Sequence, residues 1–352
     1  MRKNVAIRRR TLARSVNGKW VVGIDVGGTN VKVGLVSPQR RVVRLCLFAT
    51  QTYQKPDSFV VKISEVVQSL LEQAGLGISK LEGIGIGLPG PVDVDRGIVH
   101  SCVNIPAWQE FPLRRILKRR LNCEVFVDND VNVTALGVWM FGSGRGFCHL
   151  VCVTIGTGVG GGLILHGSLY RGSNGSAGEI GHMAVNPRGR ICACGARGCL
   201  ETEIGSLAIM DRARKAVDRK PGPLRNLARK AYGRLTPDLV CQAASRGDAA
   251  AKAIWDEVGY WLGVGLANLV NLLNPDGIVI GGGIANAWKF FSPVMMRTLR
   301  TQAMTLSART VRVVRDELGS QAGILGATVL VQQLGKRGLA TNEDFFGLGK
   351  PG

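Results

Sequence analysis

The sequence of 352 residues contains no uninterrupted apolar run of about 18 residues, the usual minimum for a membrane-spanning helix. We therefore expect no transmembrane helix and no membrane partner. Residues 1–19 are basic but lack a hydrophobic region, so they do not read as a secretory signal. The nine cysteines are an odd number, which favours reduced thiols over a disulfide framework and indicates a cytoplasmic protein.

Acidic residues are also scarce: 25 Asp and Glu stand against 45 Lys and Arg, a formal charge of +20. Such an excess can indicate a nucleic-acid partner or an acidic one. The basic residues are scattered, however, and the densest run, residues 212–234, has little aromatic interleaving for base stacking. We expect a solvated basic surface that attracts anionic substrates, and no specific nucleic acid; a true polyanion site is the alternative.

Length and glycine distribution predict two α/β domains. We expect a disordered basic arm at residues 1–18, a small domain at 19–141, a large domain at 142–336 and a loosely held tail at 337–352. A glycine-containing hinge is expected at 142–146. The final helix, predicted over 320–334, can pack back on the small domain.

Both predicted domains begin with a strand, a glycine loop and a second strand. In the first, short connections predict an antiparallel meander over 20–26, 31–37 and 41–50. In the second, strands at 149–155 and 163–169 flank a glycine turn at 156–162. Two such halves facing each other would place the loops on opposite sides of one cleft. Helices are expected at 131–141, 204–217, 236–244 and 248–273.

Three glycine loops follow apolar strands and are candidates for binding phosphate. Glycines expose backbone N–H groups, Thr29 adds a hydroxyl donor, and an Asp at a strand end suits Mg²⁺ held largely through water. No Lys-Ser/Thr follows the glycines, which excludes the P-loop. Turn geometry alone explains one such loop, but three together predict a nucleotide cleft. The predicted ATP-binding residues are Asp25, Gly27, Gly28, Thr29, Asn30, Thr157, Gly158, Gly281, Gly282 and Gly283.

Four soft or borderline metal ligands occur within eighteen residues: His182, Cys192, Cys194 and Cys199. A set of nitrogen and sulfur ligands without a carboxylate suits a closed, tetrahedral, structural Zn²⁺ site. Glycines inside the cysteine loop permit the sharp turns that it needs. Ordinary reduced cysteines in a loop are the alternative. The pattern predicts zinc.

Polar residues next to these loops carry the remaining chemistry. Asp130 lies where a predicted strand meets a helix, and its carboxylate can accept a proton from a hydroxyl that attacks phosphorus; capping of the helix is the alternative. Asn104, Asn129, Glu179 and Glu201 are acceptor-rich residues of the kind that surround a polyol. His182 can use one ring nitrogen for zinc and the other for a sugar hydroxyl. Solvated loop residues are the alternative for this set.

Over about residues 20–336 these motifs resemble the ROK family of sugar kinases and repressors, within the hexokinase–actin-like ATPase superfamily. The resemblance is carried by Asp25-Val-Gly-Gly-Thr-Asn, Gly156-Thr-Gly-Val-Gly-Gly-Gly, Gly178-Glu-Ile-Gly-His and Cys192-Ala-Cys-Gly-Ala-Arg-Gly-Cys-Leu-Glu. It implies an α/β fold of two actin-like, ribonuclease H-like domains around a cleft, with a zinc-binding loop. It also implies a homodimer or homotetramer.

The resemblance assigns roles as well. It implies Asp130 as catalytic base, Asn104, Asn129, Glu179, His182 and Glu201 as sugar ligands, zinc on His182 and the three cysteines, and an adenosine-side strand and loop at 278–285. Residues 200–202 and 271–283 are most similar to bacterial glucokinases, so the expected activity is ATP- and Mg²⁺-dependent phosphorylation of glucose at its 6-hydroxyl. The alternatives are a kinase for another hexose, such as N-acetylmannosamine or N-acetylglucosamine, and a non-catalytic sugar-sensing regulator.

Two features set limits on this resemblance. About 19 residues precede the first strand, too few for the helix-turn-helix module of family repressors, so we do not expect the DNA-binding branch. Val138 stands where glucokinases usually have Glu, and Cys102-Val103 precede Asn104. These departures leave the expected catalytic residues intact, and they leave the identity of the sugar open.

Overall fold

The computed structural model describes residues 19–53, 55–102, 108–219 and 221–337. Two five-stranded sheets dominate this part of the chain, in the orders β3-β2-β1-β4-β8 and β11-β10-β9-β12-β13. In each sheet the first three strands are antiparallel and the last three are parallel. The two sheets therefore share one topology, and the α/β fold with a repeated strand–loop–strand unit is confirmed.

The first sheet contains the predicted meander, formed by β1 (Trp20–Val26), β2 (Asn30–Val36) and β3 (Val42–Ala49), and the parallel strands β4 (Leu81–Leu88) and β8 (Val125–Asn129). Helices cover both faces of this sheet, and its central strands are therefore nearly continuous runs of apolar residues. Helices α1 (Pro56–Glu72) and α2 (Leu113–Leu121) pack on one face. A small sheet of β5 (Val92–Asp93), β6 (Ile98–Ser101) and β7 (Gln109–Phe111) lies between β4 and α2 in sequence.

The second sheet is formed by β9 (Leu150–Ile155), β10 (Val159–Leu165), β11 (Ser168–Tyr170), β12 (Gly277–Gly281) and β13 (Arg312–Arg315). The long helix α8 (Ala249–Leu273) and α9 (Trp288–Gln302) share a hydrophobic core with one face of this sheet. Shorter helices extend this layer: α4 (Leu200–Ile204), α5 (Ser206–Arg219), α6 (Pro223–Lys230), α7 (Pro237–Ser245) and α10 (Thr305–Thr310). None of the described helices is long and apolar enough to cross a bilayer.

The prediction of one helix over 204–217 is wrong at its start. Gly205 ends α4 by donating its N–H to the carbonyl of Glu201, and α5 then begins at Ser206. Because Gly has little helix propensity, the chain can change direction there, and α4 becomes a short separate helix. Helix α6, which starts with Pro223 at its first turn, was not predicted from the sequence.

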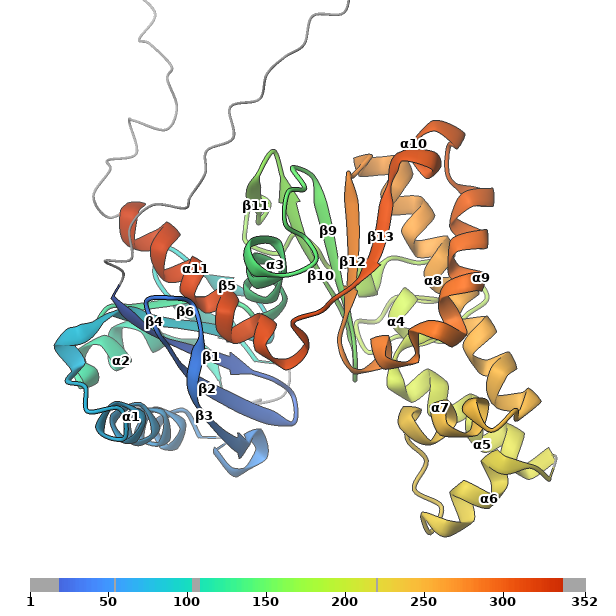
Figure 1. Ribbon diagram of the computed structural model, residues 1–352, viewed down its shortest axis with the longest axis horizontal. Helices are drawn as coiled ribbons and strands as arrows, with labels where there is room; N and C mark the ends of the chain where they lie inside the picture. The colour runs from blue at the N-terminus through green and yellow to red at the C-terminus, as the bar shows by residue number, and fades with distance from the viewer. Residues whose placement is uncertain (1–18, 54, 103–107, 220, 338–352) are drawn as a thin grey trace, which may run out of the picture.

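Two helices that are far apart in the sequence lie between the sheets: α3 (Asp130–Phe141) and α11 (Ala322–Arg337) (Figure 1). They share one core with residues of both sheets, including Val21 of β1 and Leu150 of β9. The two helices approach each other closely because glycine residues lie where they touch. A Cβ atom at Gly326 of α11 would collide with the backbone carbonyl of Val133 in α3. The C-terminal helix therefore packs against the N-terminal sheet.

The chain passes between the sheets twice, once after α3 and once after β13. Ser143 Oγ donates a 2.9 Å hydrogen bond to the carbonyl of Arg315, and Gly142 lies against Leu318. The two connections therefore contact each other. The hinge and the domain boundaries expected from the sequence stay predictions, and the arm at 1–18 and residues 338–352 of the tail lie outside the described residues.

The glycine turn predicted over 156–162 is wrong in its extent. Strand β10 begins at Val159, so Gly160, Gly161 and Gly162 are strand residues. A Cβ atom at Gly160 would collide with Val131 of α3, and one at Gly161 would collide with Ile180. These three glycines therefore allow neighbouring elements to approach the strand, and the turn itself is shorter than the glycine run suggests.

Candidate active site and metal centre

Asp130 occupies the first position of α3, directly after β8. The N-cap is Asn129, whose Oδ1 accepts hydrogen bonds from the N–H groups of Val131 and Asn132 at 2.9 and 3.2 Å. Because Asn129 already caps the helix, Asp130 is not needed for that role. Asn129 Nδ2 donates a hydrogen bond to the carbonyl of Gly90 at 3.3 Å. Both the oxygen and the nitrogen of this predicted sugar ligand's amide are therefore bonded to backbone groups.

The environment of Asp130 favours a proton acceptor. Burial raises the pKa of its carboxyl to about 7, and the negative charges of Asp25 and Glu179 act in the same direction. A hydrogen bond from the N–H of Val131, 3.0 Å from Oδ1, opposes the shift. A carboxylate with a pKa near neutrality is a stronger base than an ordinary Asp and is still partly ionised at pH 7.

Asp25 is paired with Lys32, a residue that the sequence analysis did not assign to the site. The two residues lie opposite each other in β1 and β2, and Lys32 Nζ lies 2.7 Å from Asp25 Oδ2. The start of α11 packs on the carboxylate, since a Cβ atom at Gly323 would contact it. The structure thus adds one cation to a cluster that contains the acidic groups of Asp25, Asp130 and Glu179.

The first glycine loop closes on itself. Gly27 donates its N–H to the carbonyl of Asn30 at 3.0 Å, and Thr50 Oγ1 donates to the carbonyl of Gly27 at 2.7 Å. Gly28, Thr29 and Asn30 are exposed at the tip of the hairpin. Since the N–H of Gly27 is used inside the turn, this predicted phosphate donor is engaged in the structure, and the exposed tip residues are better placed.

The second and third glycine loops lie together at one end of the second sheet. Gly156 accepts two hydrogen bonds from Ser206 at the start of α5, one from Oγ at 2.6 Å and one from N–H at 3.1 Å. Gly282 has a φ of 84° and would collide with the carbonyl of Ile155 if it carried a Cβ atom. Both the φ and the close approach require glycine at position 282, and the contact with Ile155 places the third loop next to the strand end that leads into the second.

A narrow pocket opens where the β8–α3 junction meets the second sheet. Its walls contain Asn129 and Val131 from the first half and Gly160, Gly161 and Glu179 from the second. The remaining lining residues are Gly90, Pro91, Gly175, Ser176, Ala177 and Gly178. The pocket therefore brings together predicted sugar-binding residues that are 50 positions apart in the sequence. Asn104 lies outside the described residues.

Glu201, on α4, contacts the second glycine loop. Its Oε2 accepts a 2.8 Å hydrogen bond from the N–H of Val159, and a Cβ atom at Gly158 would lie 2.5 Å from the same oxygen. The absence of a side chain at Gly158 thus makes room for the carboxylate. Glu201 therefore joins the zinc-loop side of the site to the loop predicted to hold phosphate.

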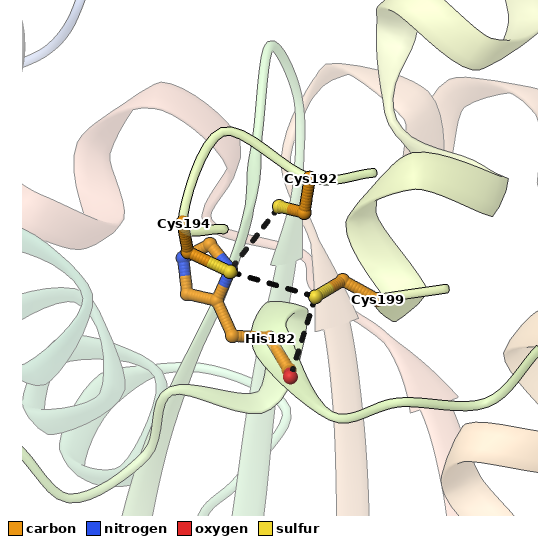
Figure 2. Close-up of side chains that lie close together, drawn as sticks. All are labelled: His182, Cys192, Cys194 and Cys199. Atoms are coloured by element: carbon orange, nitrogen blue, oxygen red, sulfur yellow. Dashed lines mark hydrogen bonds between the residues drawn. The ribbon is translucent and has the colours of Figure 1, made fainter. Parts of the chain in front are cut away.

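The predicted metal ligands converge on one point, as Figure 2 shows. One ligand atom from each of His182, Cys192, Cys194 and Cys199 lies within 4.8 Å of all the others. His182 Nδ1 is 3.6 Å from Cys192 Sγ, and Cys194 Sγ is 3.6 Å from Cys199 Sγ. Ligands of tetrahedral Zn²⁺, with Zn–S near 2.3 Å, are separated by about 3.8 Å. The donor set and its spacing fit zinc.

The other ring nitrogen of His182 points away from the cysteines. His182 Nε2 lies 4.0 Å from Glu179 Oε2 at the edge of the pocket. A metal bound at Nδ1 would fix the orientation of the ring and leave Nε2 available to a ligand in the pocket. This geometry supports the double use of His182 that the sequence suggested.

The cysteine loop is anchored to α4 and α5 by a buried acidic residue that sequence reasoning missed. Glu203 is 6% exposed; its Oε1 accepts a hydrogen bond from Asn186 Nδ2 at 2.9 Å. Its Oε2 pairs with Arg212 Nη2 at 3.0 Å, and Arg212 also pairs with Glu257 of α8 at 2.8 Å. This network holds the loop against α4, the helix that carries Glu201, and against α5 and α8.

Val138, the departure from the glucokinase pattern, lies in α3 away from the polar groups. It is 1% exposed and belongs to the core between the two sheets. An apolar side chain suits that position, since a Glu there would need a partner for its buried charge.

Comparison with known proteins places this architecture in a family. The ROK family profile matches residues 21–334, nearly the whole described chain. The chain belongs to the ROK family. This finding confirms the family predicted from the motifs and its α/β fold.

Both kinases and regulators occur among the ROK proteins similar to this chain. A glucokinase of Halalkalibacterium halodurans is 35% identical over 90% of this chain and 96% of its own length. The crystal structure of a ROK glucokinase from Streptomyces griseus in complex with glucose and AMPPNP has a TM-score of 0.77 and 31% identity, covering 89% of this chain and 99% of that one. The DNA-binding transcriptional repressor Mlc of Escherichia coli is 33% identical over 73% of this chain and 61% of its own length.

Proposed function

We propose that this protein is an ATP-dependent hexose kinase that transfers the γ-phosphoryl group of ATP to the 6-hydroxyl of glucose. The observation that carries the proposal is the position of Asp130 between two residues that line the pocket, Asn129 and Val131. Its pKa is raised to about 7 by burial and by the negative charges of Asp25 and Glu179. Similarity to glucokinases over most of the chain supports glucose as the substrate.

In the proposed reaction Asp130 accepts the proton of the attacking hydroxyl as its oxygen forms a bond to phosphorus. Glu179, Glu201 and the Nε2 atom of His182 orient the sugar hydroxyls, and Asn129 and Asn104 complete the proposed set of sugar ligands. The exposed tips of the glycine loops bind the phosphates. Closure of the units at 19–141 and 142–336 excludes water, which would otherwise compete as acceptor.

Two metal ions belong to the proposal, in different roles. Mg²⁺ would neutralise charge on the phosphates, with Asp25 as its protein neighbour through water. Zn²⁺ on His182, Cys192, Cys194 and Cys199 would be structural, because four protein ligands close its coordination shell. We further propose a cytoplasmic enzyme that forms a homodimer or homotetramer and needs neither membrane nor nucleic acid.

A coupled assay of ADP release over a panel of hexoses tests the function. We expect kcat/KM to be highest for glucose, with lower values for mannose, N-acetylglucosamine and N-acetylmannosamine, and no turnover without sugar. A clear preference for an N-acetylated hexose would mean that this sugar, and not glucose, is the substrate. Salt-sensitive DNA binding without ATP turnover on any hexose would contradict the kinase and favour a regulator, the role of the similar repressor Mlc.

A further inference from the structure

We infer that Arg171 is a positioning residue that sets the geometry between Asp130 and Glu179, an inference that rests on the proposed function. Arg171 directly follows β11 and begins the segment that leads to Glu179. Its side chain reaches the other half of the molecule and pairs with Asp128 at the end of β8, 43 positions away in the sequence.

The carboxylate of Asp128 is almost completely buried, with 2% of the side chain exposed, and both of its oxygens have hydrogen-bond partners. Arg171 Nε and Nη2 donate to Oδ2 at 2.8 and 2.6 Å. Oδ1 accepts from the N–H of Asn129 at 2.7 Å and from Asn132 Nδ2 at 3.1 Å. Arg171 therefore holds the group that orients the backbone just before Asp130 and the first turn of α3.

The backbone of Arg171 acts on the other side of the pocket. Its carbonyl accepts a 3.0 Å hydrogen bond from the N–H of Ala177, which closes residues 171–177 into a compact loop. Ala177 lies two positions before Glu179, just as Asp128 lies two positions before Asp130. At the end of this loop, Gly178 has a φ of 93° and packs against the carbonyl of Gly161. A single residue thus connects the segment of the proposed base with the segment of the proposed sugar ligand.

This connection matters because phosphoryl transfer depends on the position of the hydroxyl between its base and its ligands. A displacement of about 1 Å can lower an enzymatic rate by a factor of about a hundred. Guanidinium donates through a planar fork, so two hydrogen bonds to one carboxylate fix both distance and angle. We conclude that the pair contributes to alignment in addition to any contribution to stability.

The double variant Arg171→Met/Asp128→Asn separates alignment from stability. Removing one partner alone leaves a buried charge, whereas replacing both charges is often neutral for folding. Asn at position 128 keeps an oxygen for the N–H of Asn129. We expect kcat for hexose phosphorylation to fall about tenfold to a hundredfold and the hexose KM to rise, with the ATP KM within about twofold of wild type.

Two further variants complete the experiment. Arg171→Lys keeps the charge but loses the planar fork, so its kcat should lie between those of wild type and the double variant. Arg214→Met removes an arginine that pairs with Asp211 on the exposed side of α5, and its kinetics should equal those of wild type. If the double variant kept both kcat and hexose KM while Arg171→Lys also matched wild type, the positioning role would be wrong.

Hydrogen exchange gives a readout that does not need turnover. In the double variant the amides of Asn129 and Ala177 should exchange faster than in wild type, while those of α8 should not change. Unchanged protection at both amides would overturn the inference even if activity fell. If wild type phosphorylated no hexose, the proposed function would fail, and the exchange experiment would still decide whether Arg171 couples the two segments.

Discussion

Glu201 Oε2 lies 2.8 Å from the backbone nitrogen of Val159 and accepts its hydrogen bond. One of these residues belongs to the helix after the cysteine loop, and the other follows the glycine turn predicted to hold phosphate. A residue expected only to bind sugar therefore also supports the loop predicted to hold phosphate.

Substituting Glu201 should impair both substrates. In Glu201→Ala the N–H of Val159 loses a charged acceptor, so we expect the KM values for hexose and for ATP both to rise by about tenfold or more. Glu179→Ala is the matched variant, because Glu179 lines the pocket without this contact, and only its hexose KM should rise. Steady-state kinetics with each substrate varied in turn distinguish the two patterns; an unchanged ATP KM in Glu201→Ala would contradict the coupling.

Asp130 should control the pH dependence of catalysis. Its carboxyl must be ionised to accept a proton, and its pKa is about 7, so kcat should fall as the pH is lowered through 7. Asp130→Asn should lower kcat by a factor of about 10² to 10⁴ and leave hexose affinity near that of wild type. Rate profiles between pH 5.5 and 9, with titration calorimetry of the hexose, test both statements. A variant with near-normal turnover would remove Asp130 from the mechanism.

The same carboxyl should make folding stability depend on pH. The pKa is about 7 in the folded protein, whereas an unfolded Asp has a value of about 4. Between these values the folded state binds more protons than the unfolded state, so this group's contribution falls as the pH rises from 4 to 7. Asp130→Asn should therefore have a higher Tm than wild type at pH 8 and a smaller advantage at pH 5. An equal Tm difference at both values would mean that the pKa of Asp130 is not raised.

Loss of zinc should weaken the sugar side of the site and the fold together. Elemental analysis should give about one Zn²⁺ per chain, and Cys194→Ser or prolonged chelation should remove it. We expect a lower Tm and a higher hexose KM, because the metal orients His182 and the loop beside Glu179. Cys148→Ser, at an exposed cysteine outside the cluster, is the control. If zinc loss changed kcat but neither Tm nor hexose KM, the structural role would be wrong.

Asp248 should be important for stability and unimportant for catalysis. It is 7% exposed; its Oδ1 caps α8 through the N–H of Ala251 at 2.9 Å, and its Oδ2 accepts from the N–H of Leu224 in α6 at 2.9 Å. Asp248→Ala leaves two helix starts without an acceptor and should lower stability by about 2–3 kcal/mol. Thr236→Ala, which removes a single exposed cap of α7, should lower it by about 1 kcal/mol or less. Urea denaturation measures both, and kcat should stay unchanged.

Local features of this fold were predictable because their information lies within short stretches. The four metal ligands fall within eighteen residues, and the three meander strands and the long helix α8 follow from apolar periodicity and capping residues. The position of Asp130 after a strand and at a helix start was likewise evident from the sequence. The role of the glycines at 160–162 was not, because a glycine run looks the same whether it forms a turn or lets a helix approach a strand.

The sequence alone thus determined the family, the two related halves, the glycine loops and the cysteine cluster, all of which depend on residue type and local spacing. Only the tertiary structure decided which distant residues meet. Arg171 pairs with Asp128, Glu201 with Val159, and Gly326 of α11 lies against the carbonyl of Val133 in α3. Such contacts depend on how the two sheets and the helices between them are arranged. No local sequence pattern encodes which residues far apart in the chain come into contact. The alignment of Asp130 with Glu179 is therefore a property of the folded protein.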